Sequence, residues 1–516
     1  MTVEVPVEGG GEGAAGIDVT PPPEPDALPP ILAAALVFVA SGAVLVLEIL
    51  AVRLLAPYVG LTLETTTSII GAVLAGIAAG AAVGGYFADR VNARWLIVGL
   101  LVGGGLYALL TVPLVRWLGP GARGDGDLAA LAITLIALVP SAALLSAVSP
   151  AVARLQLHDL HRSGRVVGRL SAWATAGALV GTFGTGFVLV PLMTVTSAVL
   201  LIGSVLVLAG LVLAFASRRR SPAMVVGAVL AVGATVGLGA VAVAQDSPCD
   251  TETSYHCATI EKDPDRPTGR HLLLDDLHHS YVDLEDPTYL QYAYTNWIAD
   301  GVDGSTDPGT PLNAVFVGGG GFTLPRWLLA TRPGSKARVF EVDGQLVDFV
   351  KERLGLRPSK DLQVSVDDGR VGLLDVESDS ADVVVGDAFG NLAVPWHLAT
   401  AEWTDEVKRV LKPGGLYALN VIDLGPLDLL RAEAATLLDA FKHVRLVTYA
   451  DKKEEPTGGN AVLFASDRAM ADRVWSNDDG ALTYGHSSVT RIAGDAAVLR
   501  DDDAPTDQLL TPRKDS

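Results

Sequence analysis

The apolar residues of this 516-residue chain follow two different patterns. Between residues 30 and 245 they form long blocks, whereas later in the chain apolar and charged positions mix as in ordinary globular domains. About twenty consecutive apolar residues let a helix cross the hydrocarbon core of a bilayer. Seven blocks reach this length and are expected to form membrane helices: Ile31–Val52, Ser68–Phe87, Trp95–Val115, Leu128–Val152, Leu170–Pro191, Ser197–Ala216 and Ala223–Ala244.

The second half alternates short buried strands with amphipathic helices. The expected strands are Ala314–Val317, Ala337–Val342, Leu362–Val366, Ala381–Val385 and Leu416–Val421, with a closing pair near 443–449 and 460–466. The expected helices between them are 344–354, 400–411 and 427–441. Such alternation indicates an α/β domain with a doubly wound sheet. A small hairpin subdomain at 254–284 and an aromatic helix at Pro287–Ile298 are expected before it.

These patterns divide the chain into five parts. The first part is acidic and lacks lysine and arginine, so it cannot bury enough apolar area to fold. The predicted parts are a disordered acidic tail (1–29), a transmembrane domain of about seven helices (30–245), a hairpin and aromatic-helix subdomain (246–310), a Rossmann-like domain (311–470) and a polar C-terminal tail (471–516).

The formal net charge is −20, yet the short loops of the apolar half carry arginines. They lie in three alternate loops: Arg90 and Arg94; Arg154, Arg162, Arg165 and Arg169; and Arg218–Arg220. Arg116 and Arg123 form a smaller group on the opposite side. Because cytoplasmic loops are enriched in positive charge, we expect a multi-pass protein of the bacterial plasma membrane, with the N-terminus in the cytoplasm and the C-terminal domain outside.

Cys249 and Cys257 are the two cysteines of the chain and follow directly after the last apolar block. A disulfide between them fits an outward-facing domain, since disulfides persist in oxidising compartments. Two unpaired thiols in a cytoplasmic loop are the alternative. His256 is the one potential metal ligand beside them, too few for a structural zinc site, so no metal is expected.

Two features of the apolar blocks concern helix packing and charge. Glycines repeat every fourth residue in two blocks, a spacing that lets helices approach closely in lipid: Gly76, Gly80 and Gly84, and Gly177 and Gly181. Glu48 and Arg53 are ionisable, which is rare in a span and usually functional. They lie roughly 140° apart around a helix, so each is expected to pair with another span.

The strongest chemical signal lies at the ends of the predicted strands. One strand runs into the glycines Gly318–Gly321, and the next ends in Glu341. Glycines let a backbone approach a ligand closely, and an acid at the end of the next strand is placed to accept ribose hydroxyls. Asp368 and Asp387 follow two further strands, and ligands of such sheets bind beyond these strand ends. The set predicts one nucleoside site.

Residues 270–470 resemble the spermidine synthases, which are polyamine aminopropyltransferases with a class I methyltransferase-like Rossmann fold. The whole chain resembles their membrane-bound bacterial relatives. The resemblance implies a transferase that uses decarboxylated S-adenosylmethionine as co-substrate, with no permanently bound cofactor. It implies that Glu341 holds the ribose, that Asp368 and Gly369 border the adenine, and that Asp387 orients and helps to deprotonate the attacking amine. Donor contacts would also come from the glycine loop: Gly318, Gly319 and Gly320.

The chain departs from the family pattern on the amine side. The family's loop usually reads Gly-Gly-Gly-Asp-Gly, and Gly321 stands at the acid position. Gly390 replaces the second acid of the Asp-x-x-Asp motif that Asp387 begins. Of an expected Tyr-Gln pair, Tyr289 is present and Gln291 lies one place late. Carboxylates hold a diamine through charge-assisted bonds, so weak and broad amine selectivity is expected.

Three functions follow as hypotheses. They are aminopropyl transfer, a catalytically degenerate nucleoside sensor on a membrane anchor, and a transporter regulated by the soluble domain. The last rests on Gly84–Arg90, which resembles the cytoplasmic loop after the second helix of major facilitator transporters. The expected partners are an amine, an adenine nucleoside and the lipid bilayer. A homodimer stays open, and no nucleic-acid partner is expected.

Overall fold

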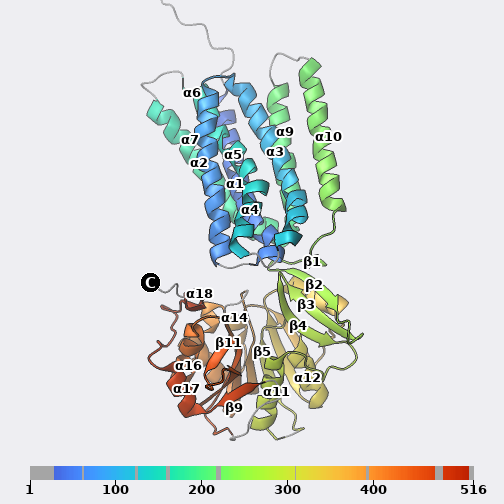
Figure 1. Cartoon of the computed structure of the whole chain (residues 1–516), viewed down its shortest axis with the longest axis vertical. Coiled ribbons are helices and arrows are strands. Elements are labelled where there is room, and N and C mark those ends of the chain that lie inside the picture. The colour runs from blue at the N-terminus through green and yellow to red at the C-terminus, as the bar shows by residue number, and fades with distance from the viewer. Residues whose placement is uncertain are drawn as a thin grey trace, which may run out of the picture.

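The computed structural model describes residues 28–60, 63–122, 126–157, 163–216, 222–307, 309–390, 394–470 and 480–510. Within these ranges the chain forms a bundle of long helices and, at one end of the bundle, a separate α/β half (Figure 1). Most of the predicted acidic tail, residues 1–29, lies outside the described residues.

The elements described in the first half are all helices, as the sequence predicted. The long ones are α1 (Pro30–Val59), α2 (Leu63–Ala88), α3 (Ala93–Leu118), α7 (Ser163–Gly184), α9 (Val195–Phe215) and α10 (Pro222–Ala244). The short ones are η1 (Gly119–Ala122), α4 (Gly126–Ala137), α5 (Val139–Ser146), α6 (Val148–Gln156), η3 (Thr185–Leu189) and α8 (Val190–Leu192). Judged by length and composition, 6 described helices could cross a membrane, and a bent pair would raise the number to 7.

The fourth predicted block is a bent helix pair, and by length and composition the pair could still be one broken span. Its two parts, Leu128–Ala137 and Val139–Gln156, meet at a bend of 46°. Pro140 lies in the first turn of α5. Proline has no N–H to donate to the preceding turn, and its ring clashes with a carbonyl there. The block therefore bends at this residue.

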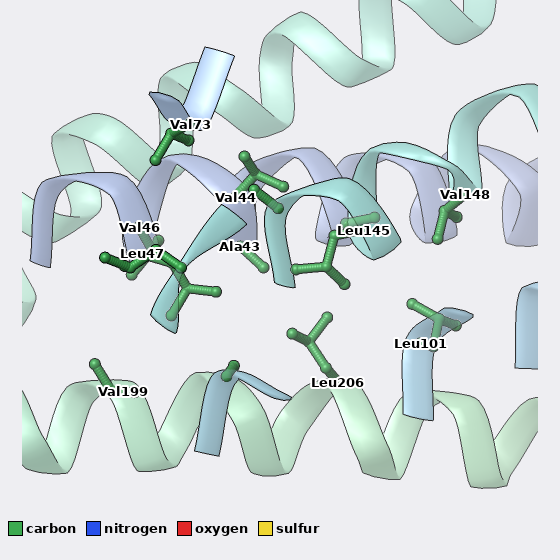
Figure 2. Close-up of a cluster of buried hydrophobic side chains, with 14 of the residues drawn as sticks. Ala43, Val44, Val46, Leu47, Val73, Leu101, Leu145, Val148, Val199 and Leu206 are labelled. Carbon is green, nitrogen blue, oxygen red and sulfur yellow. The ribbon is translucent and has the colours of Figure 1, made fainter. Parts of the chain in front are cut away.

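The helices pack through small residues and a shared apolar core. A Cβ at Gly80 would lie 2.1 Å from the carbonyl oxygen of Ala143 in α5, and one at Gly177 would lie 2.1 Å from that of Phe38 in α1. Both contacts are with backbone, so the glycine spacing brings helices into close approach. Figure 2 shows the cluster of apolar side chains that α1, α2, α3, α5, α6 and α9 share.

Apolar side chains also cover the outside of the helical half. Each of the following is more than half exposed: Leu74, Val83, Phe187, Val226 and Val236. Soluble proteins rarely expose so large an apolar surface, whereas lipid tails can contact it. The outer surface therefore has the composition of a membrane-facing one.

Among the described residues, Arg53 of α1 bonds to the α/β half and not to another span, which differs from the expectation. Arg53 donates to the backbone carbonyl of Thr253 at 2.7 Å and to that of Ser254, both in the α/β half. Glu48 Oε2 is buried and has no hydrogen-bond partner among the described residues. Because α1 continues to Val59, beyond the predicted end at Val52, Arg53 reaches the α/β half.

The α/β half begins with a small antiparallel sheet in the order β1-β2-β3-β4. Its strands are β1 (Thr251–Glu252), β2 (Cys257–Lys262), β3 (Gly269–Leu274) and β4 (Leu277–Asp283). The hairpin predicted for this region is thus part of a four-stranded sheet. The predicted aromatic helix starts too early, since α11 spans Ala293–Ser305. The side chain of Asp283 accepts from the backbone N–H groups of Glu285 and Asp286, which holds this stretch in turns.

A larger mixed sheet follows in the order β12-β10-β11-β9-β8-β5-β6-β7. Its strands are β5 (Asn313–Val317), β6 (Lys336–Glu341), β7 (Leu362–Val366), β8 (Ala381–Gly386), β9 (Leu411–Asp423), β10 (His443–Ala450), β11 (Pro456–Ser466) and β12 (Ala481–Tyr484). Strands β5 to β9 pair in parallel, and β10 to β12 are antiparallel. This is the doubly wound arrangement, so the predicted fold class is confirmed.

Helices cover both faces of the larger sheet (Figure 1). They are α12 (Thr323–Thr331), α13 (Gly344–Arg353), α14 (Gly369–Leu374), η4 (Trp396–Leu398), α15 (Ala401–Val410), α16 (Asp428–Ala440), α17 (His486–Ala493) and α18 (Thr506–Leu510). One face buries Phe316 and Val339, and the other buries Val315 and Val317. Adjacent residues of β5 thus feed opposite cores, as expected for a strand covered on both faces.

Two predictions about the part of the chain after residue 410 are wrong. The predicted polar tail, 471–516, contains β12 and α17 within its described residues, and Arg370 of α14 forms an ion pair with Asp501 there at 2.6 Å. The strand expected from Leu416 starts at Leu411 instead. Ala381 pairs with Leu411 and Val383 with Leu416, so the intervening residues form a bulge within the strand.

Candidate functional site

The site lies where the order of the parallel strands reverses. β5 is flanked by β6 on one side and β8 on the other, and ligands of doubly wound sheets bind at this switch point. The Asp387 backbone N–H donates to the Val317 carbonyl at 2.9 Å, and the Gly318 N–H donates to the Phe340 carbonyl at 2.9 Å. These bonds fix the ends of the three central strands against one another.

Glu341 holds the glycine loop. Its Oε2 accepts from the backbone N–H groups of Gly319 at 2.8 Å and Gly320 at 3.1 Å, and its Oε1 accepts from that of Asp343 at 3.0 Å. The side chain is 8% exposed. These bonds use both lone pairs of Oε2 and one of the two on Oε1. Glu341 can therefore shape the loop and still accept one ligand hydroxyl through Oε1.

The loop can take this shape because of its glycines. Gly318 has a φ of +96°, and a Cβ there would lie 2.2 Å from the carbonyl oxygen of Asp387. Phe322 follows the loop at the position where the family pattern has its last glycine, and it has a φ of 60°. A left-handed non-glycine residue costs on the order of 1–3 kcal/mol. Phe322 is fully buried, and its packing offsets this cost.

The position of the missing acid in the loop has no room for a side chain. A Cβ at Gly321 would lie 2.8 Å from the Cβ of Ser280 and 3.0 Å from Val282 Cγ2. The Gly321 N–H donates to Ser280 Oγ at 3.0 Å. The hairpin of the small sheet therefore occupies the space beside the loop.

Asp368 and Gly369 lie at the end of β7, close to the loop but in structural roles. Asp368 Oδ1 accepts from the N–H groups of Arg370 and Val371 and so caps α14, while its Oδ2 lies 2.9 Å from His397 Nε2. A Cβ at Gly369 would lie 2.4 Å from Val317 Cγ1. This glycine lets α14 start directly against β5.

Asp387 stands at the end of β8 between two donors. Its Oδ1 accepts from Asn420 Nδ2 at 2.9 Å, and its Oδ2 accepts from the Tyr294 hydroxyl at 3.3 Å. Burial raises the pKa of Asp387, and the two hydrogen bonds oppose that rise. A carboxylate with a raised pKa is a better proton acceptor.

A pocket of about 790 Å³ opens beside Asp387. Its polar lining comes from β4, the stretch before α11, α11 itself, β9 and β11. It includes His279, Gln291, Asp300, Asn420 and Asn460. No lysine or arginine is among its lining residues in the described parts of the chain. Burial lowers the pKa of His279 to about 4, so this imidazole is neutral at pH 7. The pocket is suited to a ligand that donates hydrogen bonds.

Of the two residues predicted for the amine side, one reaches this pocket. Gln291 lines it, whereas Tyr289 does not. The Tyr289 hydroxyl donates to Gln291 Oε1, and its ring stacks under Arg266 at 3.8 Å. Tyr289 thus positions Gln291.

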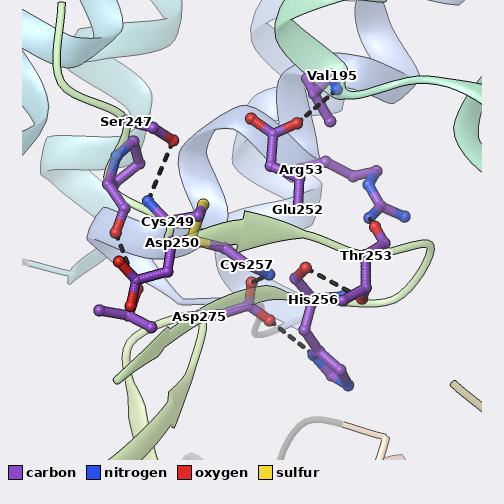
Figure 3. Close-up of a disulfide and its surroundings, with 12 residues drawn as sticks. Arg53, Val195, Ser247, Cys249, Asp250, Glu252, Thr253, His256, Cys257 and Asp275 are labelled. Carbon is purple, nitrogen blue, oxygen red and sulfur yellow. Dashed lines mark hydrogen bonds and ion pairs between the residues drawn. A yellow bond between two sulfur atoms is a disulfide. The ribbon is translucent and has the colours of Figure 1, made fainter. Parts of the chain in front are cut away.

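Cys249 and Cys257 form a disulfide at the junction of the two halves (Figure 3). It closes a loop whose carbonyls at Thr253 and Ser254 accept from Arg53 of α1. Ser254 Oγ lies 3.0 Å from Gln345 Oε1, at the start of α13. The loop therefore connects helix α1 to α13, the element that follows Glu341.

Tyr255, in the same loop, was missed by the sequence analysis. Burial raises the pKa of its phenol, and the carboxylates of Asp343, Glu341 and Asp368 raise it further. The side chain is 48% exposed. Its position between two closely spaced cysteines beside the last apolar block is the sequence signal by which it could have been found.

Comparison with known proteins adds a partial match. The chain is 26% identical over 155 residues to a polyamine aminopropyltransferase of Vibrio vulnificus (strain CMCP6), covering 30% of this chain and 50% of that protein. It is 27% identical over 155 residues to a probable polyamine aminopropyl transferase of Bifidobacterium longum (strain NCC 2705), covering 30% of this chain and 33% of the relative. The chain thus spans half or less of these relatives. No family model matches it.

Among solved structures, a probable spermidine synthase from Corynebacterium glutamicum is similar, with 26% identity and a TM-score of 0.45. That likeness covers 49% of this chain and 95% of the other. The chain is thus similar over part of its length to polyamine aminopropyltransferases.

The crowding at Gly321 generates a first prediction. Gly321→Ala should destabilise the α/β half by about 1–3 kcal/mol, since overpacking forces neighbours to move. Ser280→Gly/Gly321→Ala should cost less than the sum of the two single changes, because the clashing Cβ is gone. Chemical denaturation of all four proteins of the cycle measures this. Additive costs would contradict the packing that the structure describes.

Proposed function

We propose that the α/β half transfers an aminopropyl group from decarboxylated S-adenosylmethionine to an amine. The observation that carries the proposal is Asp387, a carboxylate of raised pKa between the glycine loop and a pocket lined with hydrogen-bond acceptors. The partial likeness to polyamine aminopropyltransferases supports it.

In this proposal Glu341 and the glycine loop bind the nucleoside of the donor, and the amine enters the pocket beside Asp387. The amine nitrogen attacks the methylene carbon that is bonded to the sulfonium. The carbon–sulfur bond breaks, its electron pair goes to sulfur, and methylthioadenosine leaves. Asp387 takes the proton that the attacking nitrogen loses, and the acceleration comes from positioning and proton transfer.

A nucleoside sensor is the second candidate. It is favoured by the absence of the two acids that the family pattern has at Gly321 and Gly390. A side chain would not fit at Gly321, and the space at Gly390 is open, since a Cβ there would meet nothing within 4 Å. Such a protein would bind nucleoside and release no methylthioadenosine. Both candidates therefore bind nucleoside, and aminopropyl transfer alone releases methylthioadenosine.

We further propose that the helical half spans a membrane and places the α/β half outside the cytoplasm. The C-terminal ends of α2 and α6 lie at the end of the bundle that is distant from the α/β half (Figure 1). Arg154 and Asp89 form an ion pair there at 3.4 Å, and Gln156 bonds the Leu28 carbonyl. Arginine-rich loops on that side and a disulfide on the other both support this orientation.

Glu341→Ala should weaken methylthioadenosine binding to the full-length protein at least about tenfold, because charge-assisted hydrogen bonds contribute roughly 1.5–3 kcal/mol each. Isothermal titration measures the affinity, and circular dichroism checks that the fold survives. Asp348→Asn, an exposed carboxylate on α13, serves as the control. Equal affinity of Glu341→Ala and the unaltered protein would remove Glu341 from the site.

The proposed orientation predicts that a membrane-impermeant thiol reagent labels Cys249 and Cys257 on intact cells, and only after reduction. The disulfide blocks both sulfurs before reduction. A Cys249→Ser/Cys257→Ser variant is the labelling control. Free thiols that react only after lysis would place the α/β half in the cytoplasm.

Asp387→Asn should lower the rate of methylthioadenosine release about a hundredfold or more, in line with the loss of a proton acceptor. Because burial raises the pKa of Asp387, the rate should start to fall at a higher pH than for an ordinary aspartate as the solution is acidified. Nucleoside affinity should change little. If the unaltered protein and the variant are both inactive on a panel of amines yet bind nucleoside, the sensor replaces the enzyme.

A further inference from the structure

The disulfide loop is attached to the α/β half on both sides of Tyr255. On one side, Ser254 Oγ lies 3.0 Å from Gln345 Oε1, at the start of α13. On the other side, His256 Nδ1 lies 3.0 Å from Asp275 Oδ2, in the turn between β3 and β4 (Figure 3). The position of Tyr255 is therefore fixed by bonds of both of its neighbours.

Both attachments are to elements that adjoin the glycine loop. The N–H of Gln345 donates to Oδ1 of Asp343, which itself bonds Glu341. On β4, Ser280 Oγ accepts from the Gly321 N–H at 3.0 Å. The disulfide loop thus lies between α13 and the β3–β4 hairpin, the two elements that flank the glycine loop.

The acids at the ends of β6 and β7 act on Tyr255. Burial raises the pKa of its phenol most, and the carboxylates of Asp343, Glu341 and Asp368 raise it further. Because the repulsion between a phenolate and a carboxylate falls with distance, the phenol lies near the ends of these two strands. The side chain is also half-exposed, so it borders open space rather than the core.

This end of the site contains an acceptor without a donor. Asp343 is 2% exposed, and its Oδ1 accepts from the N–H groups of Gln345 and Leu346. Its Oδ2 is buried and has no hydrogen-bond partner among the described residues. Buried polar groups are normally bonded, and the hydroxyl groups of a sugar are donors that would satisfy this oxygen. The ends of β6 and β7 therefore suit a ligand that carries a ribose.

The strand order indicates which part of that ligand lies near Tyr255. The order is β8-β5-β6-β7. In the proposed transfer the reacting methylene lies beside Asp387 at the end of β8, and the ribose lies at Glu341 at the end of β6. The base then continues in the same direction, over the end of β7. Tyr255 faces this region.

We propose that Tyr255 packs its ring against the base of the bound nucleoside, and that the disulfide keeps the ring in this position. The inference rests on the proposed nucleoside binding and adds a wall to that site. Tyr255 precedes residues 270–470, the part that resembles the spermidine synthases, so this wall comes from the junction with the helical half. Holding a loop in its bound conformation increases affinity because less freedom is lost on binding.

The test is methylthioadenosine binding by the full-length protein in detergent, measured by isothermal titration. Tyr255→Ala should weaken binding about fivefold or more, since the loss of stacking on a base has an effect of this size. Tyr255→Phe should retain most of the affinity, because the ring is kept. Leu284→Ala is the control, an exposed side chain just after the end of β4 that is opposite Asp275.

A double-mutant cycle tests the role of the disulfide. Cys249→Ser/Cys257→Ser should weaken nucleoside binding several-fold, and should have little effect when Tyr255→Ala is also present, because the disulfide acts through the ring. Circular dichroism checks that each variant is folded. Chemical reduction of the unaltered protein and of Tyr255→Ala gives the same comparison without the cysteine changes.

The outcomes separate this inference from the proposed function. If the unaltered protein binds methylthioadenosine and Tyr255→Ala binds it equally well, Tyr255 is not part of the site, while the proposed function stands. Equal losses in Tyr255→Ala and Tyr255→Phe would overturn the ring contact. An equal effect of the cysteine changes with and without Tyr255→Ala would overturn the role of the disulfide. If the unaltered protein binds no nucleoside, the proposed function fails together with this inference.

Discussion

The bonds between Glu341 and the glycine loop are the constraint on which the α/β half depends. A buried carboxylate must have hydrogen-bond donors, and here the donors are backbone N–H groups of the loop and of Asp343. The loop is thereby folded back over the end of β6. This places Gly318 against the backbone of Asp387, where no side chain would fit. The proposed nucleoside end of the site is therefore shaped by the protein itself.

The pocket beside Asp387, the proposed amine end, is built from other parts of the fold. Asp387 belongs to the parallel strands, but its partners Tyr294 and Asn420 come from α11 and β9, and Asn460 comes from the antiparallel strand β11. A change on the glycine loop therefore need not alter the far end of the pocket. This separation explains how the chain can lack two acids at Gly321 and Gly390 and still have a pocket lined with hydrogen-bond acceptors. The charged side chains described in that lining are carboxylates.

Residues at strand ends could be predicted from sequence because the carboxyl ends of parallel strands meet at one edge. Glu341, Asp368 and Asp387 all come together in this way. Asn460 and Asp300 could not, because their positions depend on the β9–β11 register and on the start of α11. Turns held by Asp283 delay that start. The ordered end of the chain was also missed, since β12 has only 4 residues and no long apolar run precedes it.

The contact of Arg53 with the disulfide loop has a mechanical consequence. The polypeptide between α10 and β1 is one connection between the halves, and a domain held by a single connection could swivel about it. Arg53 adds a second connection at a separate point on the bundle, and Glu252 adds a third by accepting from the Val195 N–H. Several non-collinear attachments remove torsional freedom. The α/β half is thus restrained against rotation about the α10–β1 connection, and the bond from Ser254 to Gln345 extends this restraint to the start of α13.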